Sequence, residues 1–283
     1  MGVADDASAV YWNPGGLARG AYFSLLLDSG TSDSIPNDRQ AGKQSGWLLA
    51  LGTPALGVSY YRLRMSAVNP SAQDPDLFSL TSLVTHHAGL TVVQSLTDGI
   101  AVGVTGKLIR GVAAEGATFA ARAEDVLDDF DVIGHSANRF DLDVGIMATS
   151  SIGSVGLTVR NVTEPSFETA DNVELELERQ IRGGASVLLL PTWKLAADID
   201  FTTAAGPLGE VREFALGTEA AVTKRLTARG GFRLNTAGDR GRTPAFSVGG
   251  SFAVMGSAYL DAQVTAGSDD AFRGWGVAGR ILF

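Results

Sequence analysis

The stretch "WKLAADIDFTT" (193–203) shows the pattern that decides the fold of this chain. Apolar residues occupy every second position from Trp193 to Phe201, and Lys194, Asp198 and Asp200 occupy positions between them. A period of two residues is typical of a β-strand, because successive side chains of a strand point to opposite faces of a sheet. The stretch therefore predicts a strand with one apolar face and one charged face.

The same alternation recurs along most of the chain. We expect strands near 20–28, 46–53, 55–64, 79–95, 98–110, 139–149, 152–161, 180–190, 193–202, 211–222, 226–234, 244–254, 257–266 and 274–283. Most of these segments have no helical pattern between them, so consecutive strands are joined by hairpins rather than by crossover helices. The sequence therefore predicts an all-β protein with about 14 antiparallel strands.

Composition restricts the function classes that are open to the chain. It has 283 residues, a formal net charge of −9 and no cysteine. An acidic chain without a basic patch is not a nucleic-acid-binding protein. The lack of cysteine excludes disulfides, zinc–thiolate sites and iron–sulfur clusters. The longest apolar runs, such as 185–190, fall far short of the roughly 20 residues of a transmembrane helix, whereas a barrel crosses a membrane with alternating strands.

The connections between the expected strands alternate in length. Longer connections are expected at 29–45, 65–78, 111–138, 162–179, 203–210, 235–243 and 267–273. Short turns are expected near 53–54, 96–99, 150–151, 190–193, 224–225 and 255–256. All the longer connections fall at one end of the sheet, which is typical of a transmembrane barrel in an outer membrane. A soluble β-sandwich, which has no reason to sort its loops in this way, is the alternative.

The charged face of the strands favours the same fold. In a barrel these side chains line a wet interior, the lumen, and the apolar face meets lipid, whereas in a sandwich they face solvent. The residues expected to line the lumen are Lys107, Asp141, Asp143, Arg160, Arg182, Lys194, Asp198, Asp200, Glu219, Arg229, Arg233 and Arg280. Outer-membrane lipid is therefore an expected partner of the chain.

No pattern of residues indicates an enzyme. His86 and His87 are neighbours on an expected strand, so their side chains point to opposite faces and do not share one metal ion. The chain has no nucleophile-elbow, zinc-protease or phosphate-loop motif. The carboxylate pairs of the lumen face have cationic neighbours, which favours salt-bridge networks over acid–base catalysis. We predict no metal and no cofactor.

The connection 111–138 changes its period. Apolar residues within 117–134 recur at helical spacing, which predicts a short amphipathic helix. This apolar stripe either packs on the rim of the barrel or offers a surface that receives a hydrophobic ligand. The candidate ligand contacts are Phe119, Val126, Phe130 and Ile133.

The segment "GVADDASAVYWNPGGLA" (2–18) closely resembles the N-terminal motif A-D-D-A-S-x-x-x-x-N-P-A-G-L of the FadL-type long-chain fatty-acid transporters and their PorV-like relatives. Gly15 replaces the usual alanine. Weaker similarity, more PorV-like in character, continues in 179–189, 214–235 and the final two strands. The terminal Phe283 resembles the aromatic C-terminal residue of outer-membrane barrel proteins. The resemblance implies a fourteen-stranded barrel in the bacterial outer membrane.

The resemblance also implies that residues 1–19 form a hatch folded into a barrel of residues 20–283. Asn-Pro-Gly-Gly favours a tight non-helical turn, because proline restricts φ and glycine tolerates positive φ. We expect the aromatic residues of the hatch to pack in the lumen and its acids to meet lumen arginines such as Arg229 or Arg233. The hatch residues are Asp5, Asp6, Ser8, Tyr11, Trp12, Asn13, Pro14, Gly15 and Gly16. Sealing the barrel and gating transport both fit this arrangement.

The resemblance implies two alternative functions. One is facilitated diffusion of small hydrophobic, fatty-acid-like compounds, with strand glycines such as Gly103, Gly217 and Gly249 marking kinks or bulges at a lateral opening. The other is a PorV-like module that transports nothing and docks secreted proteins or a secretion machine through its long connections. Members of these families carry a signal peptide, which we expect upstream of Met1.

Overall fold

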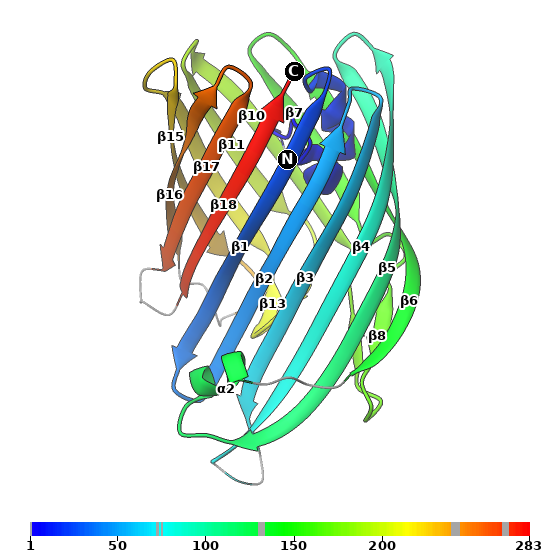
Figure 1. Cartoon of the computed structure of the whole chain (residues 1–283), viewed down its shortest axis with the longest axis vertical. Helices are drawn as coiled ribbons and strands as arrows, with labels where there is room; N and C mark the ends of the chain where they lie inside the picture. The colour runs from blue at the N-terminus through cyan, green and yellow to red at the C-terminus, as the bar shows by residue number, and fades with distance from the viewer. Residues whose placement is uncertain (1, 72–73, 75, 130–133, 239–243, 268–271) are drawn as a thin grey trace.

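The chain forms a closed barrel of 14 antiparallel strands (Figure 1). The structure is a computed structural model that describes residues 2–71, 74, 76–129, 134–238, 244–267 and 272–283. Each barrel strand pairs with the next barrel strand along the chain. β1 closes the barrel by pairing with β18, with Ser24 opposite Leu282. The predicted all-β class and the antiparallel barrel of about fourteen strands are therefore confirmed.

The elements have the following bounds. The barrel strands are β1 (Ser24–Asn37), β2 (Gln40–Gly52), β3 (Leu56–Pro70), β4 (Leu77–Thr97), β5 (Ile100–Phe119), β6 (His135–Thr149), β7 (Gly153–Arg160), β10 (Gln180–Leu190), β11 (Trp193–Asp200), β14 (Glu213–Ala221), β15 (Leu226–Asn235), β16 (Ala245–Met255), β17 (Ala258–Gly267) and β18 (Phe272–Leu282). The remaining elements are α1 (Ala9–Trp12), the 3₁₀ helix η1 (Pro14–Arg19), α2 (Ala123–Asp129), β8 (Ser166–Glu168), β9 (Glu174–Glu176), β12 (Ala204–Gly206) and β13 (Gly209–Val211).

The short turns and both ends of the chain lie at one end of the barrel, which is the upper end in Figure 1. The other end carries the longer connections and α2. We call these the short-turn end and the long-loop end. No helix among the described residues is long and apolar enough to span a membrane.

The prediction of a long connection at 29–45 is wrong. β1 continues to Asn37 and β2 begins at Gln40, so only two residues join the strands. Serine, threonine, aspartate and glycine dominate this part of the hairpin, which therefore lacks the apolar alternation that marks a half-buried strand. The ladder of backbone hydrogen bonds nevertheless continues, from Ser29 opposite Trp47 to Ser34 opposite Gly42. The connections at 65–78 and 111–138 are also shorter than predicted, because β3, β4 and β5 extend into them.

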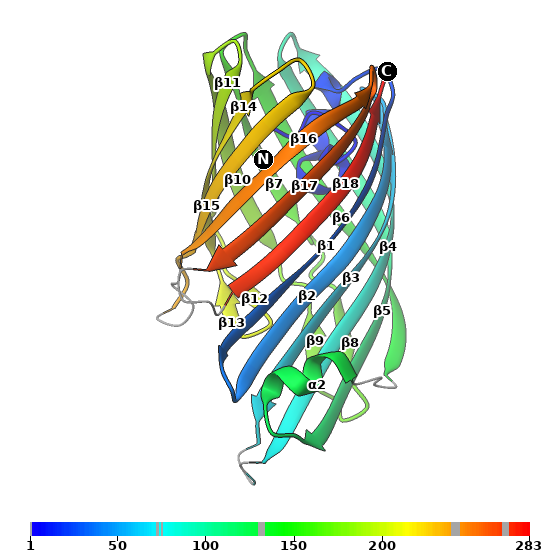
Figure 2. The same ribbon diagram turned by 60° about the vertical axis from the view of Figure 1, so that its left-hand side comes forward.

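Two of the longer connections form small hairpins that fold into the lumen (Figure 2). β8 and β9 form one hairpin within 162–179, and its Phe167 is fully buried against the lumen-facing residues Ile109 and Ala113. β12 and β13 form the second, whose Pro207 and Leu208 fill the space beside Gly42 on the opposite wall. The structure therefore narrows the lumen from the long-loop end.

The strand glycines do not mark bulges. Gly103 pairs with Gly145 and Gly217 pairs with Gly231 inside uninterrupted ladders. Register shifts in the described barrel strands occur only beside hairpin turns, as between Ser95 and Thr97. The expectation of glycine bulges is therefore wrong, and the reason for Gly103 lies in what it contacts inside the barrel.

Candidate functional site

Residues 2–19, which we call the N-terminal segment, lie inside the barrel at the short-turn end (Figure 1). α1 and η1 supply an apolar surface that packs on lumen-facing side chains of the wall. The resulting buried cluster comprises Ala4, Ala7, Ala9, Val10, Leu17, Leu26, Ala50, Val93 and Ala101. Burial of apolar surface therefore holds the segment against one side of the wall.

Asn13 and Pro14 fit a depression that glycines leave in the wall. The buried Asn13 side chain accepts a hydrogen bond from the backbone N–H of Gly15 (3.1 Å) and donates one to the carbonyl of Ile146 on β6 (3.0 Å). A Cβ at Gly103 would collide with Pro14, and a Cβ at Gly145 would collide with the Asn13 side chain. These wall glycines are required because the backbone of the segment approaches too closely for any side chain.

Asp6 joins the segment to an arginine network on β14, β15, β17 and β18, the last of which adjoins β1. Its carboxylate lies 3.0 Å from the guanidinium of Arg280, which also lies 2.6 Å from Asp261. Asp261 in turn pairs with Arg229 at 3.0 Å, and Arg229 pairs with Glu219 at 2.7 Å. The lumen arginine that Asp6 meets is therefore Arg280 rather than Arg229 or Arg233, and Asp6 reaches Arg229 only through two intermediates.

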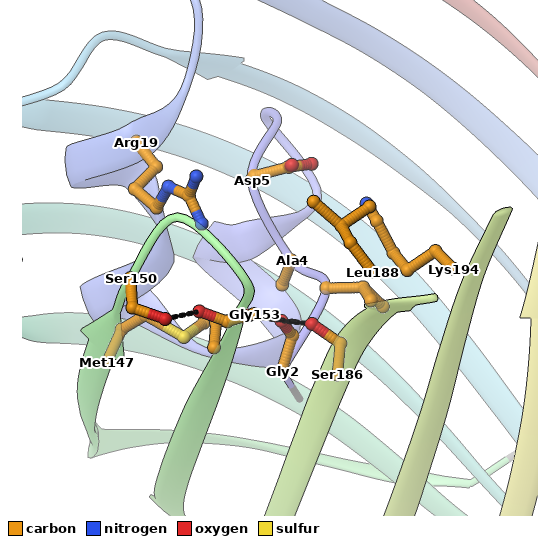
Figure 3. A pocket seen from close by; sticks show the side chains of 12 residues that line it. Gly2, Ala4, Asp5, Arg19, Met147, Ser150, Gly153, Ser186, Leu188 and Lys194 are labelled. Carbon is orange, nitrogen blue, oxygen red and sulfur yellow. Dashed lines mark hydrogen bonds between the residues drawn. The ribbon is translucent and has the colours of Figure 1, made fainter. Parts of the chain in front are cut away.

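Asp5 lines a small cavity between the segment and the wall (Figure 3). The cavity measures about 140 Å³ and also receives Arg19 of η1 and Lys194 of β11. Asp5 stays open to solvent in the mouth of the barrel, yet the enclosing wall raises the pKa of its carboxyl, and nearby Lys194 opposes the rise. The Ser186 hydroxyl donates to the Gly2 carbonyl at 3.0 Å and fixes the start of the segment.

Aromatic contacts connect the segment to β3, β4 and β7. The Tyr11 ring meets Tyr61 edge-on with centroids 5.3 Å apart, and Tyr61 stacks on His87 at 4.2 Å. The guanidinium of Arg160 lies 3.9 Å from the centroid of the Tyr11 ring. Such a cation–π contact is stronger when it is shielded from water, as it is for the buried Arg160. Trp12 meets Tyr11 edge-on at 4.9 Å but stays partly open to the lumen.

Lys107 lies between two aspartates in the wall of the lumen. Its Nζ is 2.7 Å from a carboxylate oxygen of Asp141 and 2.7 Å from one of Asp143, and it donates to the Asn161 side chain at 3.2 Å. The side chain of Lys107 is only 1% exposed, and both aspartates are buried. Loss of one member of such a buried group leaves an uncompensated charge, which is strongly destabilising.

The same aspartates replace part of the barrel ladder. β7 ends at Arg160, so the β6 residues before Val144 have no strand partner on that side. Asp143 accepts a hydrogen bond from the N–H of Asn161 (2.9 Å), and Asp141 accepts from the N–H of Thr163 (3.0 Å). These side chains, together with one backbone hydrogen bond from the N–H of Val162 to the carbonyl of Leu142 (3.0 Å), therefore close the wall here instead of a continuous ladder. We call Lys107, Asp141, Asp143, Asn161 and Thr163 the β6–β7 seam.

The other residues expected to line the lumen lie near the short β12–β13 hairpin or the N-terminal segment. Arg182 pairs with Asp200 and, at 3.4 Å, with Glu213, and Glu213 pairs with Arg233 at 3.2 Å. Lys194 lies opposite Glu219 in the β11–β14 ladder, and Asp198 lies four residues further along β11. Nine of the twelve residues thus belong to the seam, the Arg280 network or the Arg182 network, while Arg160 contacts Tyr11, and Lys194 and Asp198 lie on β11.

The candidate ligand patch of 119–133 is not one open surface. The predicted helix is present as α2, which packs on the outer wall of β2–β4 near the long-loop end. Val126 is buried there against Phe78 and Leu80, while Phe119 is exposed at the end of β5. Phe130 and Ile133 lie outside the described residues. α2 therefore covers apolar wall, as in the rim-packing alternative.

Metal ligands do not converge in the described part of the chain, where no group of three or more histidines and acids could hold an ion. His86 is on the outer face and shares a hydrogen bond with the Tyr60 hydroxyl (3.0 Å), whereas His87 is in the lumen and bonds to Thr85 (2.9 Å). The adjacent histidines therefore lie on opposite sides of the wall.

Solved structures share this architecture. A FadL homologue of Pseudomonas aeruginosa superposes with a TM-score of 0.66 at 10% identity, over 99% of this chain and 95% of that chain. The toluene transporter TodX of Pseudomonas putida gives 0.61 at 13% identity, over 98% and 94%. The monoaromatic hydrocarbon channel CymD gives 0.64 at 10% identity, over 99% and 92%. The fold is that of the FadL-type channels.

Sequence comparisons add one partial match. A family model described as "F plasmid transfer operon, TraF, protein" matches residues 78–200, which run from β4 to β11. A comparison with curated proteins finds no match. The fold is therefore the firmest link between this chain and known channels.

Sequence reasoning missed the partners that complete the seam. Asn161 and Thr163 belong to "RNVTE" directly after β7, and Asn161 has a φ of +53°. Asparagine is one of the few residues that tolerate this left-handed conformation. An asparagine that ends a strand opposite two aspartates is therefore a signal for a chain that leaves the sheet.

Proposed function

We propose that this protein is a passive channel for small hydrophobic compounds in the bacterial outer membrane, with the N-terminal segment as its hatch. The β6–β7 seam is the observation that carries the proposal. It is a place where the continuous ladder of the barrel stops and the wall is closed by side chains and by one backbone hydrogen bond, from the N–H of Val162 to the carbonyl of Leu142. A hydrophobic solute that leaves the lumen through the seam enters lipid directly.

The surroundings of the seam suit such a route. On the lumen side, Phe167 forms an apolar cluster with Leu83, Ile109 and Ala113. On the outer side, Phe140 and Val144 of β6 are exposed and apolar, as expected for lipid-facing positions. A solute therefore finds apolar surface on both sides of the wall, and the ion pairs of Lys107 are the polar barrier between them.

The N-terminal segment obstructs the straight route to the short-turn end. Its contacts with the wall are a buried apolar cluster, the Asn13 bond to β6 and the Asp6 ion pair with Arg280. As a hatch, it would exclude water-soluble compounds while the lateral route admits hydrophobic ones. Deletion of residues 5–16 is therefore expected to raise the conductance for small ions in planar bilayers, and an unchanged conductance argues against a hatch.

Transport is tested by uptake into proteoliposomes that contain the full chain. We expect faster entry of toluene and of a medium-chain fatty acid than into protein-free liposomes, and no faster entry of glucose. Toluene is chosen because two of the structural neighbours are described as a monoaromatic hydrocarbon channel and a toluene transporter. The fatty acid is chosen because the N-terminal motif resembles that of the FadL-type fatty-acid transporters. Equal rates with and without protein for both hydrophobic compounds would contradict the channel function.

The PorV-like alternative predicts a different result. A docking module would give no uptake in these liposomes and would capture a defined secreted protein from outer-membrane extract. The structure reduces the surface open to such a partner, because 29–45 is a strand hairpin and the β8–β9 hairpin folds into the lumen. The channel is therefore the function that the geometry supports best.

A further inference from the structure

A row of basic side chains crosses the outer wall of β2–β6. Arg62 on β3 lies directly opposite His86 on β4, and His86 lies directly opposite Arg110 on β5. Trp47 and Asn138 continue the row at its two ends. We call Arg62, His86 and Arg110 the basic row.

The basic row faces outward. The residues next to its members in sequence, Tyr61, His87 and Ile109, are buried on the lumen side. Because successive side chains of a strand alternate between the faces, the members of the row point away from the lumen. They therefore lie where the outer wall of the barrel meets the membrane or the solvent next to the membrane.

The row has no acidic partner. The acids of β2–β6 are Glu115, Asp141 and Asp143, and all three occupy lumen-side positions. Within the described residues, no carboxylate lies within ion-pair distance of Arg62 or Arg110. Arg62 and Arg110 flank His86 on the two neighbouring strands, so two positive charges share one patch that has no carboxylate. The arrangement is therefore one that an external anion would stabilise.

The row also marks the limit of the apolar belt on the side of the long-loop end. Outward positions are largely apolar over Ala88–Leu96 on β4, Ile100–Leu108 on β5 and Phe140–Ala148 on β6, and each run ends just before the row. Each run is close to the roughly 9–11 residues that a tilted strand needs to cross the hydrocarbon layer. The rings of Trp47 and Tyr60, 5.4 Å apart, lie at the same height, as expected for an aromatic girdle. This height is that of lipid headgroups.

A groove on the outer wall adjoins the row. It has a volume of about 620 Å³. Tyr60, Ala88 and Leu108 line it toward the short-turn end, and Arg110 and Asn138 line it toward the long-loop end. One end is apolar and the other offers hydrogen-bond donors. That combination matches a lipid, whose acyl chain and headgroup join at this height.

We propose that the basic row binds the phosphate of an anionic membrane lipid in the leaflet at the long-loop end, with an acyl chain along the groove. Arginine recognises phosphate through paired N–H donors, and His86 adds a donor at Nε2 in the tautomer in which Nδ1 accepts the hydrogen bond of the Tyr60 hydroxyl. The proposal uses the membrane location of the proposed function but does not depend on transport. Failure of the uptake assay would therefore leave it intact.

The test is native mass spectrometry of the full chain in detergent, titrated with phosphatidic acid or with phosphatidylcholine. We expect a tightly bound phosphatidic acid on the wild type, and about tenfold or greater loss of affinity in the double variant Arg62→Gln/Arg110→Gln, since each charge-assisted hydrogen bond contributes substantially. The matched control is Lys224→Gln/Arg225→Gln, which removes the same charge from an exposed turn at the short-turn end. Circular dichroism confirms that each variant retains the barrel.

Three results would overturn the proposal. They are an equal phosphatidic acid affinity of the wild type and the Arg62/Arg110 variant, an equal loss of affinity in the turn control, and equal binding of phosphatidylcholine. Inorganic phosphate at the same concentration should not displace the lipid, because it lacks the acyl chain that fills the groove. Its displacement of the lipid would show a simple anion site and would contradict a lipid site.

Discussion

Asp6 and Arg280 lie 274 positions apart in the chain, and their side chains form an ion pair at 3.0 Å inside the barrel. Arg280 sits on the last strand, which closes the barrel against β1. The N-terminal segment is therefore tied by a charged contact to β18, directly beside Leu26 of its apolar contacts. This contact is the simplest one to remove without disturbing the barrel ladder.

Asp6→Asn is expected to loosen the segment. The variant weakens a hydrogen-bonded charge contact worth about 1.5–3 kcal/mol, which corresponds to roughly tenfold or more in the population of the open form. Single-channel recording in planar bilayers should therefore show more frequent opening. The control is Glu219→Gln, which removes an acid from the same arginine network without a contact to the segment. Equal opening in both variants would assign the effect to lumen charge.

Gly145→Ala tests the fit of the segment without any change of charge. The new methyl group would occupy the place of the Asn13 side chain, so the turn at Asn13-Pro14 must move away from β6. We expect the N-terminal segment to become sensitive to protease while the barrel stays resistant. Gly217→Ala is the matched control, because its methyl group meets no atom closer than 3.8 Å. Protease resistance of the segment in Gly145→Ala would contradict the described packing.

Lys107→Met is expected to destabilise the barrel strongly. It leaves Asp141 and Asp143 buried without their cation, a change that typically costs about 3–5 kcal/mol. Urea unfolding followed by tryptophan fluorescence measures the loss. Adding Asp141→Asn and Asp143→Asn to Lys107→Met should restore much of the stability, because amides remove the unpaired charges. A stability of Lys107→Met equal to the wild type would mean that the ion pairs do not hold the seam.

The sequence predicted the barrel well because its apolar alternation reports the lipid-facing half of each strand. The prediction failed at 29–45, where the strands continue beyond the belt toward the long-loop end on polar residues such as Ser32 and Ser45, which lack the apolar alternation. It also did not single out Arg280 as the partner of Asp6, because the choice among the lumen arginines Arg229, Arg233 and Arg280 depends on strand register around the closed barrel. The seam was missed because it depends on the chain leaving the sheet at Asn161.

The central claim, that hydrophobic compounds leave through the β6–β7 seam, is tested most directly by a disulfide across it. The chain has no cysteine, and the N–H of Val162 donates to the carbonyl of Leu142 at 3.0 Å, so Leu142→Cys/Val162→Cys places a cross-link on the seam. Val144→Cys/Val159→Cys is the control, because these residues already pair in the ladder. The account predicts that oxidation slows toluene entry into proteoliposomes only for the seam pair, and that a reductant restores it. Unchanged entry through a fully oxidised seam pair would contradict it.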